Sequence, residues 1–222
     1  MEDKKKTYDP YMLAFIKIFH KHDLYGAEED EITDLEKSPD PTVERETREI
    51  FRPLFEDIQR ERLEANEYAG DPIVRLAEKR DFEGIIRLSR RVNLTDDATG
   101  IRSFSSSDLD FTVSNGVTFV ATTRSGYVIG VSSMLVGHLE GKKCGYEFTT
   151  MVSRLFRRKS VATKLFNELV NWARRNGLTH INTRHLSEDG CRFLEAVEQE
   201  LRNLKFVINK YSTTSIILQK DE

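Results

Sequence analysis

The sequence predicts an α/β (α+β) protein with a mixed central sheet, flanked by helices and preceded by a helical arm. Two β-branched runs, residues 117–123 and 127–135, are joined by the tripeptide 124–126, which is short enough for a hairpin loop. A further strand at 144–152 passes through a basic turn into a helix that begins at Val161, where apolar residues recur at helical spacing. Strands and helices then alternate to the C-terminus.

The N-terminal part of the chain is predicted to form two helical pieces. Residues 10–21 carry a broad apolar face on a short helix, and an acidic stretch at 28–40 follows as a linker. Thr42 is then expected as the N-cap of a long charged helix over 43–68. Because proline cannot donate the helical hydrogen bond, this helix should break or kink at Pro53.

The other elements follow from periodicity and from turn residues. In chain order they are a strand at 73–79, a helix at 82–92, a polar Ser-rich segment at 95–114 with an optional short helix, a turn at 140–143, a strand at 180–186, a helix at 188–204, and a pair of strands within 206–220. Asn176-Gly177 should end the helix that begins at Val161, because glycine suits the position after a helix end.

Length and composition narrow the class of protein. The 222 residues exceed one ordinary domain, and 38% hydrophobic residues permit a core beneath a heavily charged surface. No apolar run approaches the ~20 residues of a membrane span, and no apolar signal-peptide region follows the charged N-terminus. Cys144 and Cys191 have no metal-site spacing and suggest no disulfide framework. The expected protein is cytoplasmic, without membrane attachment or bound metal.

Charge is distributed unevenly along the chain. Residues 1–70 hold 19 Asp and Glu against 11 Lys and Arg, a net charge of −8. The remainder holds 18 against 23, a net charge of +5, and the two values give the overall −3. We therefore expect an acidic helical extension at 1–70 and a separate domain at 71–222. The apolar helix in the extension needs a cover, which is the chain's own core, a second copy or a protein partner.

The segment that follows the strand at 144–152 carries the strongest functional signal. Four cations, Arg154, Arg157, Arg158 and Lys159, lie between the strand and the helix that begins at Val161. A helix start offers unpaired backbone N–H groups and the positive end of the helix dipole. Together with nearby Arg and Lys side chains, these are the groups that bind a diphosphate. The segment is therefore predicted to hold a pyrophosphate.

This segment resembles motif A of the GNAT superfamily of N-acetyltransferases, Val-x-Pro-x-Tyr-Arg-Gly-x-Gly-x-Gly/Ala. Val152, Phe156, Arg157 and Ala162 match, whereas Arg154, Arg158 and Ser160 stand where the family usually has Pro, Gly and Gly. The resemblance covers about residues 71–220 and implies the GNAT fold, with acetyl-CoA as cosubstrate. It assigns these cofactor-binding residues: Met151, Val152, Ser153, Arg157, Arg158, Lys159, Ser160, Val161 and Ala162.

The same resemblance suggests candidates for proton transfer. Glu147 lies in the strand before the motif, where the family often carries its general base; the alternative is a solvent-facing strand glutamate. Leu201 occupies the position of the tyrosine that protonates the leaving thiolate in many members, and leucine cannot donate a proton. Tyr211, on the following strand, is the substitute candidate, and its alternative role is that of an ordinary strand aromatic residue.

Two classes of function remain. The first is an acetyl-CoA-dependent N-acetyltransferase that acts on a primary amine, of a small molecule or a protein, held near the segment 95–115 and the turn at 137–143. The second is a catalytically degenerate binding or structural protein of the same fold, which acts through its N-terminal arm. A third function, nucleic-acid binding, has less support. The basic residues are confined to short segments of the chain, and no aromatic platform accompanies them.

Overall fold

The computed structural model describes residues 41–50, 52–68, 70–95, 104–139, 141–184, 188–202, 204–209 and 213–218. The chain divides into two compact units, Met1–Asn66 and Glu67–Glu222. No helix in the described ranges is both long enough and apolar enough to cross a membrane.

The described part of the first unit consists of two consecutive helices, α2 (Pro41–Ile50) and α3 (Arg52–Glu67). Phe51, which stands between the two helices, lies outside the described residues, so the break or kink expected at Pro53 stays a prediction. Pro53 lies in the first turn of α3, where no intrahelical N–H is needed. Thr42 is not the N-cap, because α2 already begins at Pro41. The helix expected at 10–21 and the linker at 28–40 lie outside the described residues.

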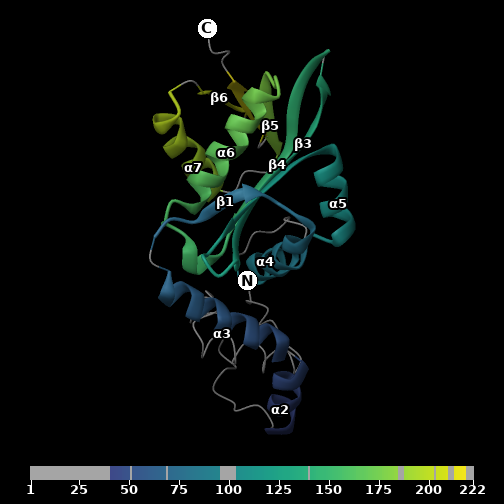
Figure 1. The fold of residues 1–222 in the computed structure, drawn as a ribbon, viewed down its shortest axis with the longest axis vertical. Helices are drawn as coiled ribbons and strands as arrows, with labels where there is room; N and C mark the ends of the chain where they lie inside the picture. The colour runs from purple at the N-terminus through teal and green to yellow at the C-terminus, as the bar shows by residue number, and fades with distance from the viewer. Residues whose placement is uncertain are drawn as a thin grey trace, which may run out of the picture. The chain divides into compact units, whose positions relative to one another are not determined.

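The second unit is built on a mixed, seven-stranded sheet in the order β1-β2-β3-β4-β5-β7-β6 (Figure 1). The strands are β1 (Ile73–Leu76), β2 (Gly116–Thr122), β3 (Val128–Leu139), β4 (Lys142–Val152), β5 (His180–Arg184), β6 (Leu204–Asn209) and β7 (Thr213–Leu218). Strands β4 and β5 pair in parallel, and all other neighbours pair antiparallel. The predicted mixed sheet with flanking helices is confirmed.

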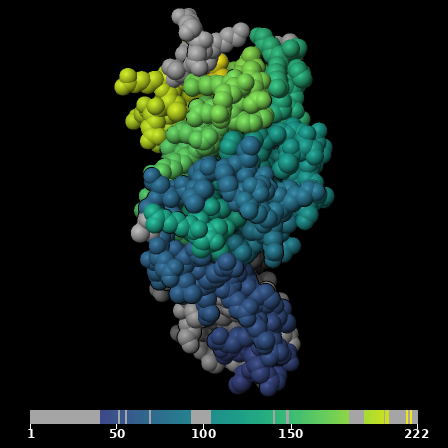
Figure 2. Space-filling model, viewed as in Figure 1, coloured from purple at the N-terminus to yellow at the C-terminus, as the bar shows by residue number. Residues whose placement is uncertain are grey.

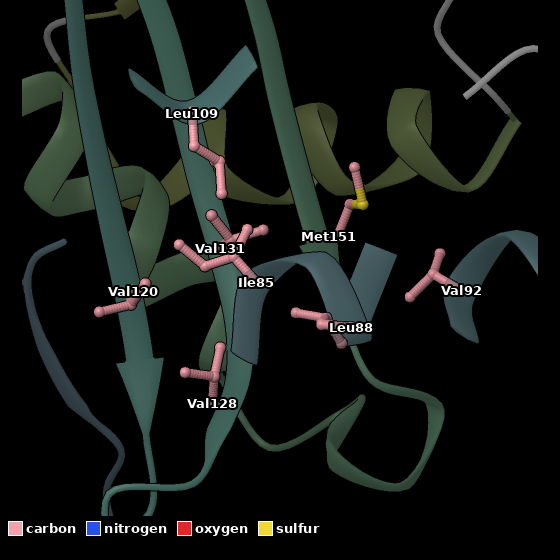
Figure 3. Close-up of a cluster of buried hydrophobic side chains, with 8 residues drawn as sticks. All are labelled: Ile85, Leu88, Val92, Leu109, Val120, Val128, Val131 and Met151. Atoms are coloured by element: carbon pink, nitrogen blue, oxygen red, sulfur yellow. The ribbon is translucent and has the colours of Figure 1, made fainter. Parts of the chain in front are cut away.

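Helices cover both faces of this sheet (Figure 1). Helices α4 (Phe82–Thr95) and α5 (Ser106–Asn115) pack on one face, over a core cluster that includes Val131 and Met151 (Figure 3). Helix α6 (Val161–Arg175) packs on the other, because a Cβ on Gly130 would lie 3.0 Å from Val161 and 2.9 Å from Leu165. Adjacent residues of a strand point to opposite faces of the sheet. Gly130 therefore faces α6, and Val131 faces α4 and α5.

Helix α7 (Glu188–Glu200) lies beside α6, and their surfaces adjoin in Figure 2. The rings of Phe166 on α6 and Phe193 on α7 meet edge to face, with their centroids 5.7 Å apart. Buried residues recur on α6 as the sequence predicts: Val161, Leu165, Phe166, Leu169, Val170 and Ala173. Burying side chains of the size of valine, leucine or phenylalanine contributes about 1.5–3 kcal/mol each, so α6 is firmly attached to the sheet.

Four elements differ from the sequence prediction. Strand β1 ends at Leu76 and not at residue 79, which lies in the 3-10 helix Lys79–Asp81, and helix α4 continues past the expected residue 92 to Thr95. Helix α5 occupies the second half of the segment that we expected to be mainly a polar loop. It begins with a capping box, in which Asp108 N–H donates to Ser105 Oγ and Ser105 N–H donates to the Asp108 carboxylate. Helix α7 ends at Glu200, before the expected end at residue 204, because Leu204 instead pairs with Leu218 in the sheet.

A buried ion pair fixes the chain between β1 and α4. The Arg75 guanidinium donates to both Asp81 carboxylate oxygens, at 2.7 and 2.8 Å, and the Glu78 amide donates to one of them at 2.8 Å. Burial of Asp81 would by itself raise its pKa. The hydrogen bonds from Arg75 and Glu78, with the charges of Arg75 and Arg80, outweigh that effect and lower the pKa of Asp81. The ionised carboxylate therefore stabilises the folded state.

Asp81→Asn should lower the free energy of unfolding by about 2 kcal/mol at neutral pH, because the bonds that it removes involve charged groups. Asp81 stabilises the fold above its unfolded pKa of about 3.9 and loses this effect as pH falls through its lower folded pKa. Denaturant unfolding of parent and variant should therefore converge in acid. Glu78→Gln, at an exposed partner of Arg75, is the control and should change stability by less than about 0.5 kcal/mol. A parent–variant difference that persists unchanged in acid would contradict this assignment.

Candidate cofactor site

Strands β4 and β5 diverge and open the sheet at its centre. Their register contains two pairs, Cys144↔His180 and Gly145↔Ile181. Beyond these pairs β4 continues alongside β3 as far as Val152, and β5 continues alongside β7 as far as Arg184. The backbone groups of β4 after Gly145 that face β5 therefore have no partner on that strand in the described register. They are available to an extended ligand lying between the strands.

A bulge in β4 marks the beginning of this opening. Leu135 pairs with Tyr146 and Ser133 pairs with Thr149, so two steps on β3 correspond to three on β4. The extra residue falls at 147–148, and bulges of this kind redirect the side chains of a strand. The backbone of Glu147 thus lies at the bulge, beside the opening, but its side chain is outside the described part of the chain. Its role as general base stays a prediction.

The turn after β4 is tied to the sheet by backbone hydrogen bonds. Ser153 N–H donates to the Ile129 carbonyl at 2.9 Å, and Phe156 N–H donates to the Ser153 carbonyl at 2.9 Å. A single 3-10 turn, η3 (Arg154–Phe156), follows, and the Phe156 side chain is fully buried. Arg157 Nε donates to the Val152 carbonyl at 3.3 Å, so this side chain folds back on the end of β4. The turn is therefore well anchored.

Two residues of the turn adopt the left-handed backbone conformation. Arg158 has φ 59° and Ser160 has φ 57°, and among the described residues no other non-glycine residue has positive φ. These are the two positions at which motif A usually has glycine. The backbone thus keeps the glycine conformation although the side chains have changed, which costs on the order of 1–3 kcal/mol per residue. Residues in such strained conformations are common at ligand-binding turns. Where right- and left-handed residues alternate, successive backbone N–H groups point to the same side and can bind an anion there.

The start of α6 is open to an anion. The first helical hydrogen bond runs from Lys164 N–H to the Ser160 carbonyl at 3.0 Å, and no side chain caps the helix. The N–H groups of residues 161–163 precede that bond, so they have no acceptor within the helix. Arg154, Arg158 and Lys159 are exposed beside them. Backbone donors, the helix dipole and exposed cations thus occur together, as a diphosphate requires.

The structure gathers the predicted cofactor-binding residues into one continuous segment. Met151, Val152 and Ser153 are buried at the end of β4, and Val161 is buried at the start of α6 with Ala162 half-buried beside it. Tyr211, the substitute proton donor, lies outside the described residues. Leu201 follows α7 directly and offers no proton. Within the described ranges, no group of three or more His, Cys, Asp or Glu is placed to hold a metal ion.

One aromatic residue at this site was not identified from the sequence. Tyr68 directly follows α3, and its ring meets that of Phe156 edge to face, with centroids 5.2 Å apart. Lys159 Nζ lies 5.2 Å from the centroid of the Tyr68 ring. Tyr68 is far from the turn in sequence, and no motif marks it. Only the folded chain brings the two together.

Replacing Ser160 by glycine should remove part of the strain in the turn. Because glycine adopts positive φ without a Cβ clash, Ser160→Gly should stabilise the protein by about 1 kcal/mol in denaturant unfolding. Ser160→Ala is the matched control, since it removes the hydroxyl, which caps nothing, but keeps the Cβ. Equal stabilities for the glycine and alanine variants would show that the left-handed conformation is not a source of strain.

Comparison with known proteins agrees with this geometry. The sequence profile of the Acetyltransferase (GNAT) family matches residues 88–197. No curated protein sequence gives a significant match. The fold is similar to that of a GNAT-family acetyltransferase from Streptococcus pneumoniae, with 16% identity, a TM-score of 0.50, and 67% of this chain and 98% of that chain covered.

Two further solved structures show the same fold. The putative acetyltransferase yncA from Salmonella typhimurium, solved with its cofactor acetyl-CoA, has 16% identity and a TM-score of 0.51, covering 69% of this chain and 96% of that chain. A GNAT-family acetyltransferase from Staphylococcus aureus Mu50 has 9% identity and the same TM-score, covering 67% and 99%. At these identities the likeness concerns the fold alone.

Proposed function

Because this chain belongs to the GNAT family of acetyltransferases, we propose that it transfers an acetyl group from acetyl-CoA to a primary amine. The main support for this proposal is that two structural features suited to acetyl-CoA lie next to each other at the C-terminal end of β4. There the sheet opens between β4 and β5, and the uncapped start of α6 follows after the basic turn. One feature suits an extended pantetheine arm, and the other suits the diphosphate attached to it.

The residues of this segment would divide the work of binding. Backbone N–H groups at residues 161–163, with the Arg158 and Lys159 side chains, would hold the diphosphate, while Arg157 would keep the turn in place through the Val152 carbonyl. Backbone groups of Met151, Val152 and Ser153 would pair with the pantetheine arm, because strand β5 has moved away from this part of β4. An N–H there would also polarise the thioester carbonyl, which is where negative charge develops during acyl transfer.

Acyl transfer needs a neutral amine and a proton for the departing thiolate. The amine nitrogen attacks the thioester carbon, the C–S bond breaks, and the proton lost by the nitrogen balances the one that the thiolate gains. We assign acceptance of the amine proton to Glu147, from its backbone position at the bulge beside the opening. Tyr211 or water would protonate the thiolate, since Leu201 cannot.

The alternative function is a catalytically degenerate GNAT-fold binding protein. The leucine at position 201 and the two non-glycine residues in the motif turn favour it. Release of free CoA from acetyl-CoA, measured with a panel of small primary amines, polyamines, and peptides with free N-termini or lysines, separates the two functions. The acetyltransferase should release CoA in step with acetylation of at least one class of amine. Binding of acetyl-CoA without turnover on any class would contradict the enzyme and leave the binding protein.

We further propose that residues 1–70 mediate self-association, as a separate acidic extension of the domain at 71–222. In the described part of this extension, Ile50 and Leu63 are 65% and 63% exposed, so their apolar side chains are open to contact with a second copy. The alternatives are contact with the chain's own core and with a protein partner. The apolar residues expected in the first helix lie outside the described residues.

Deleting residues 1–40 should convert an oligomer into a monomer, measured by light scattering after size-exclusion chromatography. About six large apolar side chains are expected in the deleted helix, and burying them contributes on the order of 10 kcal/mol. Retention of the oligomer after deletion would contradict self-association through this segment. A monomeric parent whose stability does not change on deletion would exclude both self-association and contact with its own core.

A further inference from the structure

Tyr68 lies outside the part of the chain that matches the family profile, yet it contacts the cofactor turn. The profile begins at residue 88, and Tyr68 stands between the end of α3 and the beginning of β1. Its ring packs edge to face on Phe156 at an interplanar angle of 90°. Phe156 is fully buried beneath the turn, and Tyr68 packs against it.

Lys159 is held by this pair of rings. Its Nζ lies 5.2 Å from the centroid of Tyr68 and 5.4 Å from that of Phe156, both within the range of a cation–π contact. A lysine side chain has many rotamers, and an anion that binds a free lysine must restrict them. The rings restrict Lys159 before any ligand arrives. This lysine also lies between the two left-handed residues, Arg158 and Ser160, so its backbone direction is restricted too.

A second contact fixes the same short segment to the first turn of α6. Asp71 Oδ1 and Lys164 Nζ lie 2.6 Å apart, with Asp71 just before β1 and Lys164 on α6. Tyr68 and Asp71 therefore contact the chain on the two sides of the helix start, Tyr68 at Phe156 and Lys159 and Asp71 at Lys164.

The Tyr68 hydroxyl takes no part in the contact with Lys159. It is buried, and no hydrogen-bond partner satisfies it. Burial, with an added effect from the Asp71 charge, raises the pKa of Tyr68, so the phenol stays neutral at physiological pH. The contact with Lys159 is thus made through the ring face and not through a phenolate. Because a buried hydroxyl without a partner destabilises the fold, Tyr68→Phe should not lower stability.

We propose that Tyr68 is a positioning residue of the acetyl-CoA site, whose ring holds the Lys159 ammonium at the start of α6 for the diphosphate. The inference rests on the proposed function. It extends the site to a residue N-terminal of the matched family region. Tyr68 acts through Lys159, so it should affect the affinity for acetyl-CoA and not the rate of the chemical step.

The test is a double-mutant cycle on the full chain, with acetyl-CoA affinity measured by calorimetry. Tyr68→Leu removes the ring, Tyr68→Phe keeps it, and Lys159→Met removes the charge. We expect Tyr68→Phe to bind within about 2-fold of the parent and Tyr68→Leu to bind about 5-fold more weakly, as loss of one cation–π contact implies. Tyr68→Leu combined with Lys159→Met should bind no more weakly than Lys159→Met alone. In turnover, KM for acetyl-CoA should rise while kcat stays constant.

The outcomes are distinguishable. Tyr68→Leu binding as tightly as Tyr68→Phe, or more tightly than the parent, would overturn the positioning role. Additive losses in the double variant would also overturn it, because Tyr68 would then act without Lys159. The melting temperature of each unliganded variant separates these effects from unfolding. A parent that fails to bind acetyl-CoA at all would contradict the proposed function itself.

Discussion

The double charge reversal Arg158→Glu with Lys159→Glu should abolish acetyl-CoA binding, with a loss of affinity of at least about 100-fold. Both side chains are exposed beside the uncapped start of α6. The substitution removes two attractions for the diphosphate and introduces two repulsions. Arg157 is left unchanged because its side chain hydrogen-bonds the Val152 carbonyl, so replacing it would also disturb the turn. Calorimetric titration measures the effect directly.

A matched control separates local from overall electrostatics. Arg175→Glu with Arg202→Glu makes the same change of net charge on exposed residues. Arg175 is the last residue of α6, at the end opposite the turn, and Arg202 follows α7. This variant should bind acetyl-CoA within about 3-fold of the parent, because exposed charges beyond a Debye length of about 8–10 Å are screened. Undiminished binding in the Arg158 and Lys159 variant would exclude the turn as the diphosphate site.

Glu147→Gln should lower kcat about 100-fold near neutral pH, the effect expected from loss of a general base. Glutamine cannot accept the amine proton, so the reaction would depend on the fraction of amine that is already neutral. The pH–rate profile should therefore shift upward, while affinity for acetyl-CoA stays intact. Glu195→Gln, an exposed carboxylate on α7, is the control and should leave the profile unchanged. Equal activity of parent and Glu147→Gln at every pH would reduce Glu147 to a structural strand residue.

Sequence reasoning was most successful where local periodicity and tertiary packing agree. The strand, basic turn and helix over residues 144–175 were predicted because apolar spacing changes there from period two to helical spacing. The prediction of α7 ran past its end because Leu204 continues the helical spacing, although in the fold it pairs with Leu218. Helix α5 shows the opposite case. Its capping signal, Ser105 with Asp108, is readable in the sequence but was outweighed by the polar composition of the segment.

The site itself could be predicted only in part. The motif residues are consecutive, so their proximity was certain once the turn was identified. The left-handed backbone at Arg158 and Ser160 is not readable from those residue types, because arginine and serine ordinarily avoid positive φ. The opening between β4 and β5 depends on the register of two strands distant in sequence. Tyr68 reaches Phe156 only through the fold of the whole second unit.

We propose that the turn between β4 and α6 binds the diphosphate of acetyl-CoA. Calorimetric titration of the full chain with acetyl-CoA is its most direct test. We expect saturable binding of one molecule per chain, with a Kd in the range of ~1 μM to 1 mM that is usual for enzyme substrates, and this binding should weaken as salt rises. A correctly folded chain that shows no saturable binding up to about 1 mM acetyl-CoA would contradict it.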